Sequence, residues 1–240
     1  MGKKRKNSNY VTAKREQARI EKEREMRAKK RNMIIKAVSI PVVAVLLIVA
    51  IILGISYVVQ WYNNPNKDFK VTHVATIKIK DYGTVRVNLY GEEAPISVSN
   101  FVELANKGFY NGLTFHRIMD GFMAQGGCPY GTGTGDSGKD IVGEFSANSI
   151  ENNVKHVRGT ISMARGDDPN SASSQFFIVH ETSDKNTIAL DGNYAAFGMV
   201  TRGMSVIDKM IRSSVKKGYT ESVASKDQPI IESITIVEVN

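Results

Sequence analysis

The residues best suited to chemistry lie in one run, Phe115 to Gly127, with the sequence FHRIMDGFMAQGG. Large apolar side chains alternate there with a guanidinium, an imidazole, a carboxamide and a pair of glycines. In a core strand, Arg117 and Gln125 would be buried without obvious partners, which costs free energy. The same mixture suits a shallow apolar pocket into which a few polar groups point. The run therefore predicts a binding site, and SMAR (162–165) and SSQFFI (173–178) have a similar composition.

Other kinds of chemistry find little support in the sequence. Cys128 is the only cysteine, and the four histidines lack metal-ligand spacing, so we expect no metal site. Residues 133–139 fit the first seven positions of a phosphate-binding loop, but Asp140 stands where Ser or Thr is required. The G-x-S-x-G motif of a hydrolase nucleophile is absent from the sequence.

Together with GTGTG (131–135), SSQFFI and LDGNYAAFG (190–198), the run resembles the cyclophilin-type peptidyl-prolyl cis-trans isomerases. The resemblance covers roughly residues 74–239 in the order and spacing of that family. It implies a mostly β fold, a closed eight-stranded antiparallel barrel capped by two helices. It also implies an enzyme that isomerises X–Pro bonds of polypeptides and needs no cofactor.

The resemblance also implies roles for single residues. Arg117 would donate to the twisted amide, Gln125 would help to hold Arg117, and Phe122 would complete the catalytic set. Four apolar residues would line the proline socket, Phe122 among them, and further residues would follow the substrate groove. The substrate-binding residues are His116, Met123, Ala164, Arg165, Gln175, Phe177, Leu190 and Tyr194.

The chain departs from the common family pattern at three places. Ala189 stands where many members have tryptophan, which puts tight binding of the inhibitor cyclosporin in doubt. Tyr194 replaces a common histidine, and the loop at residues 165–169 is one residue longer than usual. None of these changes removes the donor or the apolar socket.

Charge is concentrated at the N-terminus. Residues 1–36 hold 14 of the 32 Lys and Arg residues and four acids, a net charge of +10, whereas the rest of the chain carries −2. The domain is therefore not expected to bind nucleic acid. We expect residues 1–33 to be a basic cytoplasmic tail that contacts anionic lipid head groups, with RNA, a ribosome or a protein as alternative partners.

Residues 37–59 contain no charge, and as a helix they would extend about 34 Å, enough to cross a hydrocarbon core of about 30 Å. We expect residues 34–62 to be a transmembrane signal-anchor, since the run is too long for a cleaved signal peptide. The preceding basic residues predict a cytoplasmic N-terminus and a domain outside. The sequence contains no N-x-Ser/Thr glycosylation acceptor, which permits a bacterial envelope, and we expect the membrane to be that of a bacterium. Residues 63–70 would be a linker to the isomerase domain at residues 71–240.

Several elements of the domain follow from pattern. Alternation predicts a hairpin within residues 73–89, and Pro95 predicts a helix that ends near Gly108. Residues 121–143 are glycine-rich and are expected to be irregular. The remaining expected elements are short strands near 159–163, 175–180 and 195–200, a helix at 205–211 and a final strand at 230–239.

The leading interpretation is a monomeric, membrane-anchored isomerase that acts on proline-containing unfolded or nascent polypeptides. The first alternative is a non-catalytic peptide-binding or chaperone module that uses the same groove. A second alternative places the function in the basic tail, as a docking device.

Overall fold

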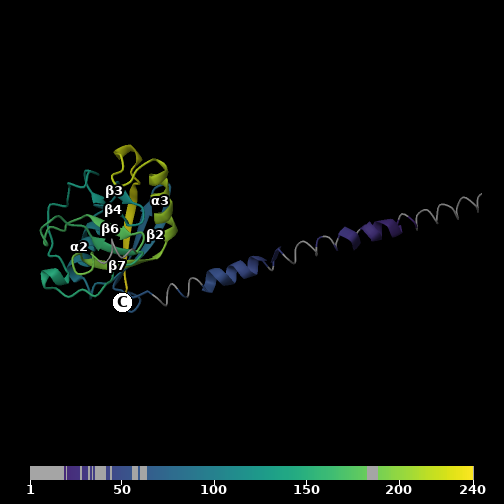
Figure 1. Ribbon diagram of the computed structural model, residues 1–240, viewed down its shortest axis with the longest axis horizontal. Helices are drawn as coiled ribbons and strands as arrows, with labels where there is room; N and C mark the ends of the chain where they lie inside the picture. Colours follow the sequence, from purple (N-terminus) through teal and green to yellow (C-terminus); the bar gives the residue numbers. More distant parts are fainter. Residues whose placement is uncertain are drawn as a thin grey trace, which may run out of the picture. The chain divides into compact units, whose positions relative to one another are not determined.

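The structure is a computed structural model. It describes residues 64–182 and 189–239, together with residues 19, 21–27, 29–31, 33, 35, 42, 43, 45–55 and 59. Two compact units are present, Met1–Asn63 and Asn64–Asn240. The second unit carries the sheet and both of the helices described below (Figure 1).

The first two strands of the domain form the expected hairpin. β1 (His73–Ile79) pairs antiparallel with β2 (Gly83–Leu89) across a turn at Asp81. Alternate residues such as Ile77 and Val85 are fully buried, because one face of a strand pair collects every second side chain. Hydrophobic alternation therefore predicts both the strands and the face that they bury.

The eight strands of the domain form one antiparallel sheet in the order β3-β4-β6-β5-β7-β2-β1-β8. The expected closed barrel is wrong, because the sheet is open between β3 and β8. In the described part of the chain, an isolated bridge between Thr114 and Ile230 joins that edge to the opposite end of the sheet. The remaining strands are β3 (Thr114–Met119), β4 (Met123–Cys128), β5 (Thr160–Met163), β6 (Phe176–Val179), β7 (Ala196–Arg202) and β8 (Ile231–Glu238).

The strand pair β3–β4 differs from the sequence-based expectation. Residues 121–143 were expected to be irregular, but β4 begins at Met123. Gly126 and Gly127 allow the strand to approach its neighbours closely: a Cβ would lie 2.9 Å from Thr114 O and 2.6 Å from Ser174 O, respectively. Gly127 also has a φ of +85°, which favours glycine. The glycine pair therefore marks a bulged strand and not a loop.

Two helices flank the sheet and lie well apart in Figure 1. α2 (Pro95–Asn106) begins with the proline as expected, and the carboxylate of Glu144 accepts hydrogen bonds from Ile96 N (2.8 Å) and Ser97 N (2.7 Å). A distant residue therefore caps this helix. The other helical elements described in the second unit are α3 (Met204–Lys216) and the short 3-10 helices Ser146–Asn148 and Ser225–Asp227.

The main core is aromatic. The Phe101 ring lies 5.2 to 5.4 Å, between centroids, from the rings of Tyr110, Phe176 and Phe197. All four side chains are fully buried. They hold α2 against the inner face of the sheet, and so leave the outer face of β3, β4 and β6 available for a site.

The stretch expected as a linker contributes to the domain. Asn66 is fully buried, donates to Lys155 O and accepts from Lys155 N, both at 2.8 Å. Residues 45–55 of the first unit are helical. Within the described part of the chain, no helix is both long and apolar enough to span a membrane. The expected anchor at 34–62 includes residues 34, 36–41, 44, 56–58 and 60–62, which lie outside the described residues.

Candidate active site

Strand pairing places the central predicted residues in one row. Arg117 on β3 lies opposite Gln125 on β4, and Gln125 lies opposite Phe177 on β6. In a sheet, directly paired residues project to the same face. Ile118, Ala124 and Phe176, the sequence neighbours of the three residues of this row, belong to the main core, so the row itself lies on the outer face of the sheet.

A second apolar cluster, separate from the main core, occupies this face. We call it the outer cluster. Its floor is buried, and four partly buried residues form its rim. Partly exposed apolar side chains beside buried ones form a surface that can bind a small apolar ring. The floor consists of Met123, Phe177, Val179 and Leu190, and the rim of Met119, Phe122, Ala164 and Tyr194.

The Arg117 guanidinium lies beside the outer cluster and is held on several sides. Its Nε donates to Glu221 Oε1 at 2.8 Å, and Nη1 donates to Gln125 Oε1 at 3.3 Å. Its Nη2 lies 3.2 Å from the sulfur of Met119, which is a rim residue. The side chain is 34% exposed, so the guanidinium remains accessible to a ligand.

Two carboxamides extend this polar network away from Arg117. Gln125 Nε2 donates to Gln175 Oε1 at 2.9 Å. Gln175 Nε2 in turn donates to the carbonyls of Gly133 (2.9 Å) and Gly135 (2.8 Å). Since both ends of Gln125 are engaged, its carbonyl oxygen is fixed toward Arg117.

A pocket of about 350 Å³ opens at this end of the network. Four predicted site residues line it, and two carboxylates, Asp136 and Asp140, add negative charge. The Arg165 side chain is held against neighbouring residues of the site. Its guanidinium stacks over the Tyr194 ring at 4.8 Å, and its Nε donates to Asn193 O at 3.0 Å. The predicted residues in the lining are Gln125, Ala164, Arg165 and Gln175.

The Phe177 ring packs against His156, a residue that the sequence analysis did not assign to the site. The His156 ring stacks on it, with centroids 6.0 Å apart and an interplanar angle of 16°. His156 Nδ1 lies 2.8 Å from Asp191 Oδ1, and Nε2 lies 3.0 Å from Ser162 Oγ. Burial alone would raise the pKa of Asp191, but the hydrogen bonds from His156 lower it overall. Ser162 is fully buried, which excludes it as a nucleophile toward a substrate.

His116 is the most buried of the predicted polar site residues. It is 5% exposed, and neither ring nitrogen has a hydrogen-bond partner among the described residues. Burial lowers its pKa, and the charge of Arg117 lowers it further, against the opposing effect of the Thr114 backbone. The ring packs near Gly133, where a Cβ would lie 3.4 Å from Nε2. The structure therefore places His116 beneath the site.

Phe122 and Leu190 come to the outer cluster from turns. The Phe122 carbonyl accepts from His180 N at 2.7 Å, which ties the β3–β4 turn to the end of β6. Leu190 is 7% exposed and lies next to the exposed Ala189. The structure therefore brings all the predicted residues to one region. It adds Glu221, which is 104 positions from Arg117 and gave no signal in the sequence.

The site is thus an arginine beside an apolar cluster on the outer face of an eight-stranded antiparallel sheet, and comparison with known proteins gives the class to which it belongs. The family model for "Cyclophilin type peptidyl-prolyl cis-trans isomerase/CLD" matches residues 74–240, and the chain belongs to this family.

Individual relatives agree with this assignment. A peptidyl-prolyl cis-trans isomerase of Helicobacter pylori is 42% identical over 159 residues, covering 65% of this chain and 91% of that protein. Peptidyl-prolyl cis-trans isomerase B of Bacillus subtilis is 43% identical over 139 residues, covering 58% and 91%. The crystal structure of a Cryptosporidium parvum cyclophilin type isomerase, in the presence of the dipeptide Ala-Pro, has a TM-score of 0.58 and 29% identity, and it covers 68% and 98%. The chain is thus an enzyme of the peptidyl-prolyl cis-trans isomerase class.

Proposed function

We propose that the domain isomerises X–Pro bonds in unfolded or nascent polypeptides, with Arg117 as the donor and the outer cluster as the proline socket. The observation that carries this proposal is the position of Arg117. It shares a cross-strand row with Phe177 and contacts Met119, so a cation borders the apolar floor. The Ala-Pro dipeptide present with the Cryptosporidium relative supports the choice of ligand.

The chemistry needs little more than this arrangement. Rotation about a peptide bond must break its amide resonance, with a barrier of about 18–20 kcal/mol. Without help, an X–Pro bond takes roughly tens to hundreds of seconds to rotate. As the bond twists, the prolyl nitrogen becomes pyramidal and regains its lone pair. A donor that binds the twisted amide better than the planar one by about 1.36 kcal/mol accelerates the reaction tenfold.

Each remaining residue has a place in this proposal. Phe122, Met123, Phe177 and Leu190 hold the pyrrolidine ring, because apolar surface favours it over water. Gln125 fixes Arg117 through the hydrogen bond described above. The residues proposed to follow the peptide on either side of the proline are Ala164, Arg165, Gln175 and Tyr194, and His116 supports the groove from beneath.

The test compares the full chain with Arg117→Ala and Arg117→Lys in a peptide isomerisation assay in mild detergent. We expect Arg117→Ala to lose at least about 100-fold in kcat/KM, about 2.7 kcal/mol. Arg117→Lys should recover little, because a lysine lacks the planar fork. A variant as active as the wild type would end this account of catalysis, and retained peptide binding without turnover would identify Arg117 with the chemical step.

We also propose that residues 34–62 anchor the chain in a bacterial membrane, with the basic tail on anionic cytoplasmic head groups and the domain outside. The uncharged run of residues 37–59 supports this. The described helical residues 45–55 are apolar and solvent-exposed; Leu46, for example, is 62% exposed and Leu53 is 65% exposed. A surface of this kind favours lipid over water.

Fractionation of cells that produce the chain tests the anchor. We expect it to remain in membranes after an alkaline carbonate wash and to be released by the double variant Leu46→Arg/Leu53→Arg. Protease added to intact cells, after removal of any outer wall, should digest the domain. A wild-type chain recovered in the soluble fraction would overturn the anchor, and a protected domain would overturn the orientation.

A further inference from the structure

The segment between α3 and β8, residues 217–230, covers the open edge of the sheet beside Arg117. We call it the α3–β8 segment. Ile118 N donates to Glu221 O at 2.7 Å, and Val223 N donates to His116 O at 2.9 Å. Between these two bonds, Arg117 forms an isolated antiparallel bridge with Ser222. The segment therefore runs along β3 and satisfies backbone groups that an edge strand would leave free.

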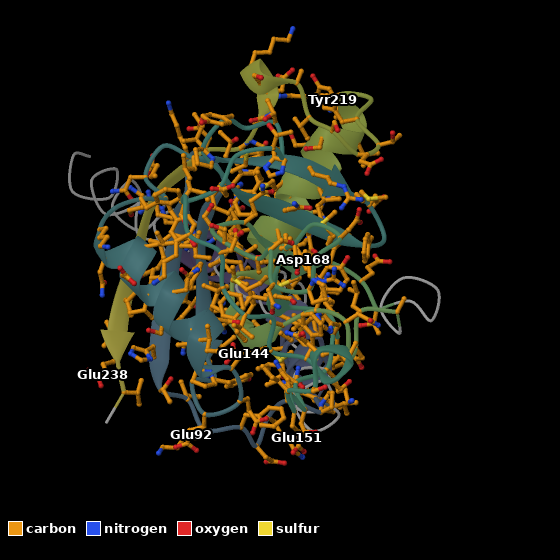
Figure 2. The ribbon with its side chains drawn as sticks, turned by 90° about the vertical axis from the view of Figure 1, so that its left-hand side faces the viewer. Glu92, Glu144, Glu151, Asp168, Tyr219 and Glu238 are labelled. Atoms are coloured by element: carbon orange, nitrogen blue, oxygen red, sulfur yellow. The ribbon has the colours of Figure 1, made fainter. Side chains whose placement is uncertain are left out.

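Side chains hold this segment in place at both ends. Asp227 accepts from Tyr219 Oη and from Lys217 Nζ, both at 2.8 Å. Gln228, which is 8% exposed, donates to Gly131 O at 2.8 Å and to Val223 O at 2.9 Å. Figure 2 shows Tyr219 in the turn after α3, well away from Glu92 and Glu238. A residue on the α3–β8 segment therefore has a fixed position relative to β3.

Glu221 uses that position to bind the guanidinium. Its Oε1 accepts from Arg117 Nε at 2.8 Å, the length of a charge-assisted hydrogen bond. A guanidinium has five N–H groups. One donates to Glu221, one to Gln125, and one points toward the sulfur of Met119. The remaining N–H groups belong to the two terminal nitrogens, so the side chain is held while donors stay available for a peptide.

We propose that Glu221 is a positioning residue for Arg117. This inference rests on the proposed function, in which Arg117 is the donor. A long arginine side chain loses conformational freedom when it is ordered. Glu221 and Gln125 together select the conformation beside the outer cluster before a peptide arrives. Because this ordering is complete in the free enzyme, it lowers the barrier from the bound peptide to the twisted amide and leaves peptide affinity nearly unchanged.

The exposure of the pair sets the size of the expected effect. The side chains of Arg117 and Glu221 are 34% and 52% exposed. Solvent and salt therefore weaken the pair, as for other surface ion pairs. We expect Glu221→Ala to lower kcat by about three- to fivefold with little change in KM. The loss should shrink at high salt, where the wild-type pair is itself weakened.

The experiment measures kcat and KM for the full chain, for Arg117→Ala and for four further variants in mild detergent. Glu221→Ala removes the acceptor, and Glu221→Gln keeps an oxygen that can still accept from Nε, so the latter should recover part of the rate. Glu232→Gln is the matched control, because Glu232 pairs with Lys78 at 2.6 Å on β8 and β1. The fourth variant combines Glu221→Ala with Arg117→Ala. If Glu221 acts through Arg117, this double variant should be no slower than Arg117→Ala alone.

A second readout does not depend on activity. The Arg117 Nε–H signal in ¹⁵N NMR should be protected from exchange in the wild type and in Glu232→Gln, and it should exchange rapidly in Glu221→Ala. An unchanged kcat together with an unchanged signal in Glu221→Ala would overturn the inference. A higher kcat in Glu221→Ala would also overturn it, because Glu221 would then slow the reaction. If Arg117→Ala itself keeps full activity, the proposed function fails instead, and the two failures are thereby distinguished.

Discussion

Phe176 and Phe177 are neighbours on β6, yet they belong to different parts of the molecule. The Phe176 ring packs edge-to-face against Phe101 and Phe115 in the main core, at centroid distances of 5.4 and 5.9 Å. The Phe177 ring faces the outer cluster and contacts His156 and Tyr194 at 6.0 and 5.9 Å. Their exposures, 0% and 4%, hardly differ.

The difference lies in what borders each ring. Phe176 is surrounded by other buried apolar side chains, as in the interior of any compact domain. Phe177 is bordered by a half-open apolar rim on one side and by the polar His156 network on the other. The exposed fraction of a side chain therefore does not distinguish a core residue from a site residue. The residues that surround the side chain do distinguish them.

The largest expected effect is the loss of stability in Phe176→Ala. Removing this ring leaves a cavity among side chains that cannot close it, at a cost of about 3–5 kcal/mol in the free energy of unfolding. Phe177→Ala should cost about half of this, because its half-open surroundings can relax or admit water. Urea unfolding of the full chain measures both values. Equal losses would remove the distinction between the two clusters.

For activity we expect the reverse order, with a larger loss in Phe177→Ala than in Phe176→Ala. Phe177→Ala removes part of the proline socket, and we expect kcat/KM to fall about tenfold or more, which corresponds to about 1.4 kcal/mol. The control is Phe69→Ala, which removes an aromatic ring that packs on Tyr90 outside the outer cluster. Peptide isomerisation assays on folded protein make the comparison. A control as slow as Phe177→Ala would point to general loosening of the fold.

Gln125→Leu probes the polar border of the outer cluster. This change keeps the approximate shape of the side chain but removes the hydrogen bonds to Arg117 and Gln175. We expect kcat to fall about three- to tenfold. Gln125→Glu should fall less, since a carboxylate still accepts from Arg117. If both variants match the wild type in steady-state assays, Gln125 does not hold the guanidinium.

The smallest expected effect concerns acid stability near Phe177. Because the pKa of Asp191 is lowered from its ordinary value of 3.8, its carboxylate stabilises the fold above about pH 3.8, and this stability is lost as the pH falls further. Asp191→Asn should therefore flatten the acid branch of a stability profile measured by unfolding at pH 6 and pH 3. An acid branch as steep in Asp191→Asn as in the wild type would contradict this assignment.

Local pattern predicted the parts of the fold that depend on local rules. The β1–β2 hairpin and the start of α2 at Pro95 follow from alternation and from the position of proline in the first turn. The β3–β4 strands were harder to recognise, because the outer cluster gives both faces apolar residues and so obscures the alternation. The open edge at β3 depends on how far the sheet curls, which no single segment specifies.

The site likewise contains residues that could be predicted from local sequence and residues that could not. The resemblance supplied Arg117, Gln125 and the apolar residues, because they lie in continuous motifs. His156 and Glu221 escaped notice, because each acts through a partner brought close only by the fold. A charged residue on a connecting segment is usually a solvated one, and nothing in its own neighbourhood along the chain distinguishes Glu221 from the other acids.

The most direct test of the account measures exchange of a proline peptide on the protein. NMR exchange spectroscopy with peptide near saturation reports binding and cis–trans interconversion separately. With the wild-type chain, we expect the two isomers to interconvert many times faster than in the free peptide. With Arg117→Ala, the same chemical-shift changes on binding should appear while interconversion falls back toward the uncatalysed rate. Fast interconversion in Arg117→Ala would contradict the claim that the cation beside the outer cluster drives the rotation.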